Sequence, residues 1–134
     1  MSRLMSVAMT ADAVMGRRKT VTRRKGWTFV KPGDRITLCR KVRGRKPGEP
    51  IERLADVEVV SVRREWLRKL IDAYPHARWY GNREVEREGF PGMEPRTFVK
   101  RFFLDAQGMA LDDEVTRIEW RYLDGEEPGD AAQD

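Results

Sequence analysis

Apolar and polar residues alternate along several stretches of the chain, and this alternation predicts strands because successive side chains of a strand point to opposite faces. The clearest case is Val115–Leu123, in which apolar Ile118, Trp120 and Tyr122 alternate with charged residues. We expect one face of this strand to be buried and the other to meet solvent. The other predicted strands are Leu4–Met9, Arg35–Val42 and Ala55–Arg63, with a short extended segment at Thr20–Arg24.

Apolar residues that recur every three or four positions predict two longer helices. The first, Arg64–Tyr74, brings Trp66 and two leucines to one face, and a proline ends it. The second, Glu94–Leu104, accepts Pro95 in its first turn and turns three phenylalanines inward. Between them, residues 76–87 are polar and aromatic without clear periodicity and are interpreted as a loop.

A short helix is also predicted at Ala11–Met15, with Thr10 as its N-cap and Gly16 at its end. Regular crossover helices do not separate the strands, which argues against a doubly wound parallel sheet. The predicted fold class is therefore α+β, a small and mostly antiparallel β-barrel of roughly five strands with two or three flanking helices. It forms one domain over residues 1–123. Residues 124–134 carry five acids and no base, which predicts an acidic, disordered tail.

Positive charge is concentrated in residues 16–46, which hold 13 of the 27 Lys and Arg residues and a single acid, Asp34. Such a surface attracts phosphates at long range and predicts RNA or single-stranded nucleic acid as partner. The alternative is a solvated face that only aids solubility. Trp27, Trp79 and Tyr80 lie in aperiodic stretches and are candidates for stacking on bases. The candidate basic contacts are Arg17, Arg18, Arg23, Arg24, Lys25, Arg40, Lys41, Arg43, Arg45 and Lys46.

Several classes of site are excluded by the residues that the chain lacks. With one cysteine, Cys39, and one histidine, His76, it can form neither a Cys/His metal site nor an intramolecular disulfide. A lone cysteine favours a reducing compartment, and we expect a cytoplasmic monomer without metal or cofactor. No apolar run is long enough to span a bilayer, so we expect no membrane partner. Gly16–Thr20 lacks the first glycine of a phosphate-binding loop.

Lys19 and Thr22, three residues apart, could carry out acyl-transfer chemistry. A hydroxyl attacks a carbonyl only when a base removes its proton, and a lysine can be that base when burial or neighbouring arginines lower its pKa. A carboxylate would complete such a site by orienting the lysine or assisting the leaving amine. These residues alone do not identify the carboxylate. The alternative is that Lys19 contacts a phosphate and Thr22 is an ordinary strand residue.

Three short sequence motifs follow one another along the chain. Lys19–Arg24 reads KTVTRR, and Val30–Ile36 follows with a Gly-Asp turn into a strand. Glu88–Phe90 then precedes a predicted helix. Together, over Leu4–Leu123, these stretches resemble ASCH domains, a branch of the PUA-like superfamily. The continuation of the third motif to Met93 is similar to the small ASCH proteins that are common in phages and prophages.

The resemblance implies a PUA-like β-barrel with a cleft for RNA or a modified nucleoside. Some small ASCH proteins are amidohydrolases that remove the acetyl group from N4-acetylcytidine with a lysine, a threonine and a glutamate. On the matching positions, the resemblance implies Lys19, Thr22 and Glu88 as catalytic residues. Three alternatives stay open: a non-catalytic nucleic-acid-binding module built on residues 16–46, metal-free RNA cleavage, and an interaction protein that blocks a host partner.

Overall fold

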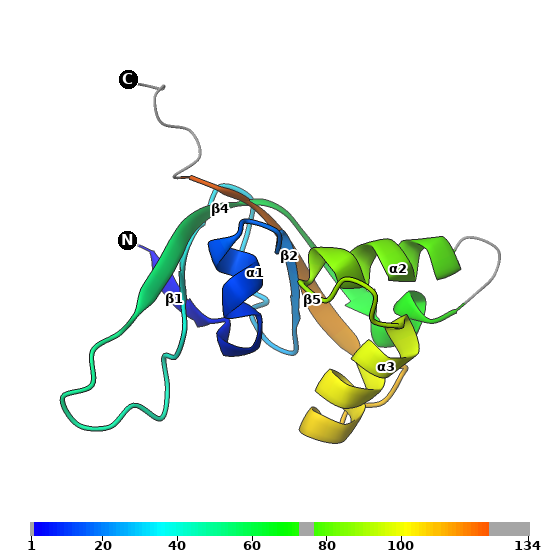
Figure 1. The fold of residues 1–134 in the computed structure, drawn as a ribbon. Coiled ribbons are helices and arrows are strands. Elements are labelled where there is room, and N and C mark those ends of the chain that lie inside the picture. Colours follow the sequence, from blue (N-terminus) through cyan, green and yellow to red (C-terminus); the bar gives the residue numbers. More distant parts are fainter. Residues whose placement is uncertain (1, 73–76, 124–134) are drawn as a thin grey trace.

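The computed structural model describes residues 2–72 and 77–123 and has one mixed five-stranded sheet with helices packed around it (Figure 1). The strand order is β1-β3-β4-β5-β2, in which β1 and β3 are parallel and the other neighbours antiparallel. The sheet curls strongly, although its edge strands do not pair to close a barrel within the described residues, and the predicted α+β fold class is confirmed. The strands are β1 (Arg3–Ser6), β2 (Val21–Arg24), β3 (Arg35–Cys39), β4 (Arg53–Trp66) and β5 (Glu114–Tyr122).

The helices are short and lie in two groups. One group precedes β2, and α2 and α3 lie together at the far end of β4 and β5 (Figure 1). The helical elements are η1 (Ala8–Thr10), α1 (Ala11–Met15), η2 (Leu67–Leu70), α2 (Ala77–Arg87), α3 (Pro95–Val99) and the π-helical continuation η3 (Lys100–Asp105). The predicted helix at Glu94–Leu104 is thus confirmed, although its second half is wound as a π-helix.

Two hydrophobic clusters meet along the strand β5. The first lies under β1, β3 and α1 and includes Met5, Leu38, Val57 and Trp120. The second is built from η2, α2 and α3 with the start of β5. β5 links the two clusters, because Ile118 belongs to the first and Val115 to the second.

The predicted helix at Arg64–Tyr74 is wrong. β4 continues to Trp66, which pairs with Glu114 of β5, and only the short 3-10 helix η2 follows. Leu67 and Leu70 are both buried, one 3-10 turn apart, and this spacing imitates a helical face. Trp66, expected in the core, has 57% of its surface exposed, whereas Trp120 is buried as predicted.

The interpretation of residues 76–87 as a loop is also wrong, because α2 spans Ala77–Arg87; His76 lies outside the described residues. This helix lacks a clear apolar stripe because one of its inward-facing residues is a glutamate, Glu84, with no exposed surface. The burial of Glu84 also explains a second difference between the structure and the sequence prediction. Arg117 of β5, expected to face solvent, is buried and forms an ion pair with Glu84.

Candidate active site

Lys19 and Glu88, which are 69 residues apart in the sequence, meet inside the protein. The Nζ of Lys19 donates to the backbone oxygen of Glu88 at 2.6 Å and to its carboxylate Oε1 at 3.2 Å. Only 4% and 5% of the two side chains are exposed. The basic stretch after α1 and the turn after α2 therefore form a single site.

Glu88 is placed by the end of α2. Gly89 takes a φ of +106°, a conformation that favours glycine. Its N–H donates to the oxygen of Glu86, and the N–H of Phe90 donates to the oxygen of Val85. These two bonds form a Schellman motif, a common way to end a helix. The sequence Glu88–Phe90 thus encodes both the end of α2 and the position of the carboxylate.

Lys19 is placed by a similar ending of α1. Arg17, rather than the expected Gly16, takes the left-handed conformation (φ 61°), and the N–H of Arg18 donates back to Ala13. Two aromatic residues of β5 then fix the backbone oxygen of Lys19, which accepts from Trp120 Nε1 at 3.0 Å and from the Tyr122 hydroxyl at 2.5 Å. These contacts hold the base of the lysine side chain rigidly.

Lys19, Thr22 and Glu88 line the same cleft, which encloses about 350 Å³. Thr22 is buried, and its Oγ1 accepts a hydrogen bond from Arg24 Nε at 3.1 Å, so the hydroxyl hydrogen remains for another acceptor. Four aromatic residues also line the cleft: Phe90, Phe98, Phe102 and Phe103. All three residues that the resemblance implied as catalytic are thus brought together.

Behind the cleft, Arg23 forms the centre of a buried ion network. Its Nε donates to Glu65 at 2.7 Å and its Nη2 to Glu84 at 2.6 Å. Its Nη1 donates to Glu88 Oε2 at 3.0 Å, so the glutamate is held from one side by Lys19 and from the other by Arg23. Because Arg23 is fully buried, it has no surface for the nucleic-acid contact that the sequence suggested.

Glu84 anchors the network. It accepts from Arg117 Nε as well as from Arg23, both at 2.6 Å. Burial opposes ionisation of Glu84, but the hydrogen bond from Arg117 and the charge of Arg23 outweigh it and lower the pKa of Glu84 from 4.5 to about 2. Sequence reasoning missed Glu65, Glu84 and Arg117. One signal was present, since Glu84 and Glu88 are four residues apart, a spacing that brings the last turn of α2 and the residue after it to the same side.

Burial is also the main influence on the cleft lysine. Removal from water lowers the pKa of Lys19 below its ordinary value of 10.5. The positive charges of Arg24 and Arg23 act in the same direction, and Glu88 opposes them. Lys19 therefore releases its proton more readily than a surface lysine, which a general base requires.

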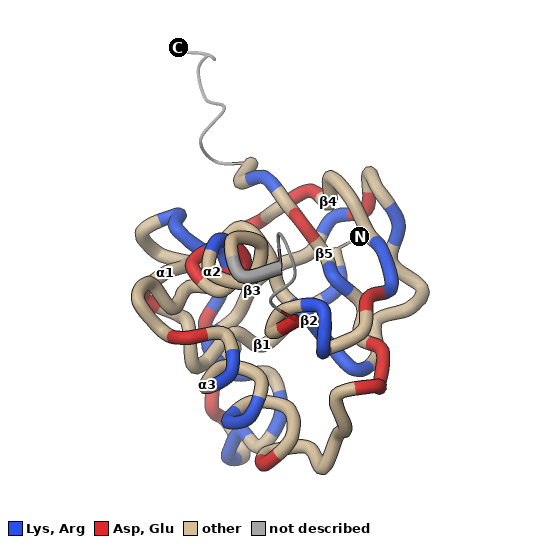
Figure 2. Tube along the Cα trace, turned by 90° about the vertical axis from the view of Figure 1, so that its right-hand side faces the viewer, with Lys and Arg blue, Asp and Glu red and all other residues tan. Residues whose placement is uncertain are grey.

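The remaining basic candidates are spread over the surface, and Figure 2 shows Lys and Arg on α2 and α3 as well as on residues 16–46. Several have local partners: Arg40 pairs with Glu52, Lys41 lies 3.8 Å from Glu49, and Arg17 donates to the oxygen of Val14. Four others lie on the surface: Arg18, Lys25, Arg43 and Lys46. Arg45 also lies there and donates to two backbone oxygens of its own loop.

The three aromatic candidates differ in their surroundings. Trp79 has 62% of its surface exposed, and the guanidinium of Arg83 lies 4.3 Å from its ring centre. Tyr80 is half-buried, donates to Glu65 and has the Lys69 ammonium 5.1 Å from its ring. Trp27 is also half-buried and packs against the first hydrophobic cluster, so it has less surface available for a base.

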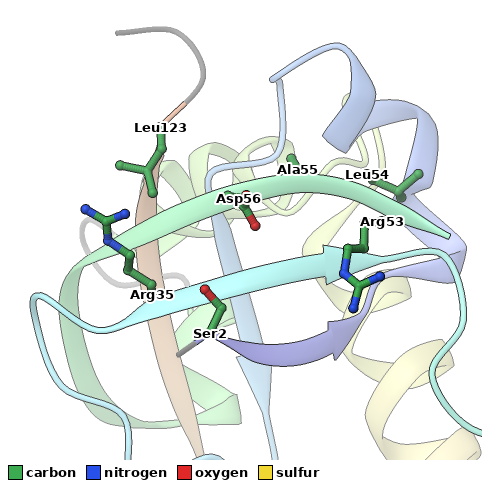
Figure 3. Close-up of a pocket in the computed structure, with 7 residues that line it drawn as sticks. All are labelled: Ser2, Arg35, Arg53, Leu54, Ala55, Asp56 and Leu123. Atoms are coloured by element: carbon green, nitrogen blue, oxygen red, sulfur yellow. The ribbon is translucent and has the colours of Figure 1, made fainter. Parts of the chain in front are cut away.

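A second, larger hollow of about 490 Å³ lies on β3 and β4 (Figure 3). Arg35 and Arg53 stand at its two ends, and Asp56 lies between them. The Asp56 carboxylate accepts from the Thr37 hydroxyl at 2.7 Å. None of the three implied catalytic residues lines this hollow.

The described part of the chain contains no cluster of three or more His, Cys, Asp or Glu residues arranged to hold a metal ion. Among the same residues, no helix combines the length and apolar character needed to cross a membrane.

Comparison with known proteins places this geometry in a fold. No family model matches the sequence, and no curated protein sequence matches it significantly. Among solved structures, the chain is similar to an ASCH protein from Zymomonas mobilis, with a TM-score of 0.52 and 14% identity over 90% of this chain. The match spans 65% of that protein, less than two thirds of its length. An ASCH domain from Lactobacillus crispatus JV V101 gives a TM-score of 0.55 and 12% identity over 85% of this chain and 70% of that one. The chain therefore has the fold of ASCH domains, as the order of its sequence motifs predicted.

Proposed function

We propose that the cleft binds an N4-acylated cytosine base or nucleoside and hydrolyses its exocyclic amide. The observation that carries this proposal is the contact of buried Lys19 with Glu88 in the cleft that Thr22 also lines. A lysine with a lowered pKa, a hydroxyl and a held carboxylate supply a base, a nucleophile and a group that orients the substrate. The aromatic rings that line the cleft suit a nucleobase, because bases stack on such rings, and Phe90 and Phe102 are the half-buried ones among them.

In the first step, neutral Lys19 accepts the Thr22 hydroxyl proton while Oγ1 forms a bond to the amide carbon. The carbonyl electron pair moves onto its oxygen. As the C–N bond breaks, the Lys19 ammonium returns the proton to the leaving N4 nitrogen, which releases the cytosine amine. Water then hydrolyses the acyl-threonine to a carboxylic acid. In the alternative form of this step, Thr22 positions a water molecule that attacks the amide directly.

Glu88 acts as the orienting group in this scheme. A carboxylate has about four lone-pair directions, and the bonds from Lys19 and Arg23 use only part of this capacity. Glu88 can therefore also accept the N–H of the substrate amide and hold the leaving nitrogen near Lys19.

The test is release of cytidine from N4-acetylcytidine, followed by chromatography. Lys19→Met and Thr22→Ala should each lower kcat/KM by about 10²–10⁴-fold, the usual contribution of a positioned acid or base. Lys100→Met is the matched control, because the side chain of that lysine is 70% exposed and pairs with Asp105 outside the cleft. Absence of turnover, or turnover unchanged in Lys19→Met, contradicts the proposal. Mass spectrometry of an acyl-protein in Thr22→Ser distinguishes the nucleophile from the water-positioning role.

A second candidate function, binding of single-stranded nucleic acid, is favoured by the surface around Trp79. Arg83 covers this exposed ring, and Lys69 and Arg63 lie near Tyr80, so aromatic rings and cations alternate there. Stacking of a base on such a ring contributes about 1–3 kcal/mol. Fluorescence anisotropy with labelled RNA should show binding that weakens with salt and weakens further in Trp79→Ala. Equal affinity in Trp79→Ala and in Trp66→Ala, a control with a similarly exposed ring, would exclude this role.

A further inference from the structure

The buried charges of the described residues are balanced in number. Six charged residues are buried, three cations and three carboxylates: Lys19, Arg23, Arg117, Glu65, Glu84 and Glu88. Their side chains pair with one another through contacts of 2.6–3.2 Å. A buried charge without a partner is costly, and this cluster leaves none of its six members without one.

Arg24 is a further cation that does not belong to this cluster. It is half-buried and lines the cleft, and no carboxylate of the described residues lies within ion-pair distance of its guanidinium. Burial lowers the pKa of Arg24, and the charge of Glu88 opposes this effect, but Glu88 is already paired with Lys19 and Arg23. One cationic group in the cleft is therefore left for a negatively charged ligand atom.

The position of Arg24 is fixed next to the proposed nucleophile. Its Nε donates to Thr22 Oγ1 at 3.1 Å, and its Nη2 donates to the backbone oxygen of Ser6 at 2.8 Å. A guanidinium has five N–H donors, so three are left after these two bonds. These two bonds fix the orientation of the guanidinium. Electrostatic stabilisation of a transition state requires such a preorganised donor.

We propose that Arg24 forms an anion subsite in the cleft and that, in the reaction proposed above, it binds the carbonyl oxygen on which negative charge develops. When Thr22 Oγ1 bonds to the amide carbon, the electron pair of the C=O bond moves to this oxygen, a short distance from Oγ1. The spare N–H groups of Arg24 donate to that oxygen and transfer no proton. The assignment of Arg24 to the carbonyl oxygen rests on the proposed function. The binding of an anion by Arg24 does not depend on that function.

The experiment compares Arg24→Gln and Arg24→Lys with Arg64→Gln. Arg64 is a matched control, because its Nη1 also donates to a threonine hydroxyl, Thr116 Oγ1, at 2.7 Å, but it does not line the cleft. Arg24→Gln should lower kcat for N4-acetylcytidine by about 10²–10³-fold with little change in KM, as loss of an oxyanion donor does. Arg24→Lys should recover part of kcat, because lysine keeps the positive charge but lacks the planar set of N–H donors of a guanidinium. Equal kcat in Arg24→Gln and Arg64→Gln would overturn the inference.

A second measurement does not require turnover. Inorganic phosphate at constant ionic strength should raise the Tm of the wild-type protein and of Arg64→Gln, and this rise should be lost in Arg24→Gln. If the wild type does not hydrolyse the amide but shows this phosphate effect, the proposed reaction fails and the anion subsite stands. If phosphate stabilises Arg24→Gln as much as the control, the subsite itself is refuted.

Discussion

The cleft beside Lys19 and the hollow on β3 and β4 hold charged residues in different environments. The hollow is larger, about 490 against about 350 Å³, but Arg35, Arg53 and Asp56 at its rim are exposed. Water solvates such groups, so a missing partner has little cost there. The charged groups of the cleft are buried or half-buried, and burial of a charge is costly unless a partner or a bound ligand compensates it. We therefore base the proposed site on the burial of charge rather than on the size of a hollow.

The two regions also differ in how the chain builds them. The hollow is formed mainly by neighbouring strands β3 and β4, which pair directly. The cleft joins the ends of α1 and α2 with β2 and the α3 region, and the N–H of Thr20 donates to the oxygen of Arg87 to tie two of these parts together. Its chemistry therefore depends on long-range packing, and we expect it to be sensitive to changes outside the cleft.

The largest expected effect is on the network that supports the cleft. Glu84→Gln should lower the free energy of unfolding by about 3–5 kcal/mol, because it leaves Arg117 without its buried anionic partner and removes one of the three buried carboxylates that Arg23 contacts. Urea denaturation followed by circular dichroism measures this change. Glu86→Gln is the matched control, an exposed glutamate on the same helix that should change stability little. Equal stability of the two variants would show that the network is not a major contributor.

The sequence predicted the parts of the molecule that follow simple periodicity. The alternation of Ile118 and Trp120 with charged residues located β5, and the phenylalanines located α3 and its π-helical continuation. The resemblance implied Lys19 and Glu88 as parts of one site, and the two side chains do contact each other, whereas their catalytic roles stay a prediction. These features are predictable because apolar burial and local turn chemistry determine them.

The rest could not be predicted because it depends on buried charge. α2 has a glutamate on its inner face, so its pattern does not resemble an amphipathic helix. Arg117 is on the charged face of an alternating strand but is buried, since a carboxylate from α2 meets it. Polar residues are assigned to solvent in pattern reasoning, and only the three-dimensional pairing reverses that assignment.

The pH dependence of stability should show the same network. Because the folded-state pKa of Glu84 is lowered from 4.5 to about 2, its contribution is fully present above pH 4.5. It is lost as the pH falls from about 4.5 to 2, where the unfolded chain takes up the proton first. Stability should therefore decline over this range in the wild type and decline less in Glu84→Gln. Parallel curves for the two proteins would contradict the prediction.

A smaller effect is expected at the turn that positions the cleft carboxylate. Gly89→Ala puts a Cβ at a φ of +106°, 3.0 Å from the Ala13 Cβ, and should cost about 1–3 kcal/mol in stability. Gly92→Ala is the control, since its φ is also positive but its Cβ would meet no atom within 4 Å. Thermal unfolding should show a larger loss at Gly89, and amide hydrolysis should fall only there, because Glu88 moves.

The smallest effect is expected in the hollow of Figure 3. Asp56→Ala removes the acceptor of the Thr37 hydroxyl and should cost about 0.5–1.5 kcal/mol, the usual net value of one hydrogen bond. Asp56→Asn should recover most of this loss, because an amide oxygen can accept the same bond. Neither change should alter hydrolysis, because neither Asp56 nor its partner Thr37 lines the cleft. A larger loss in Asp56→Ala than in Glu84→Gln would reverse the comparison and make the hollow, rather than the cleft, the more tightly coupled region.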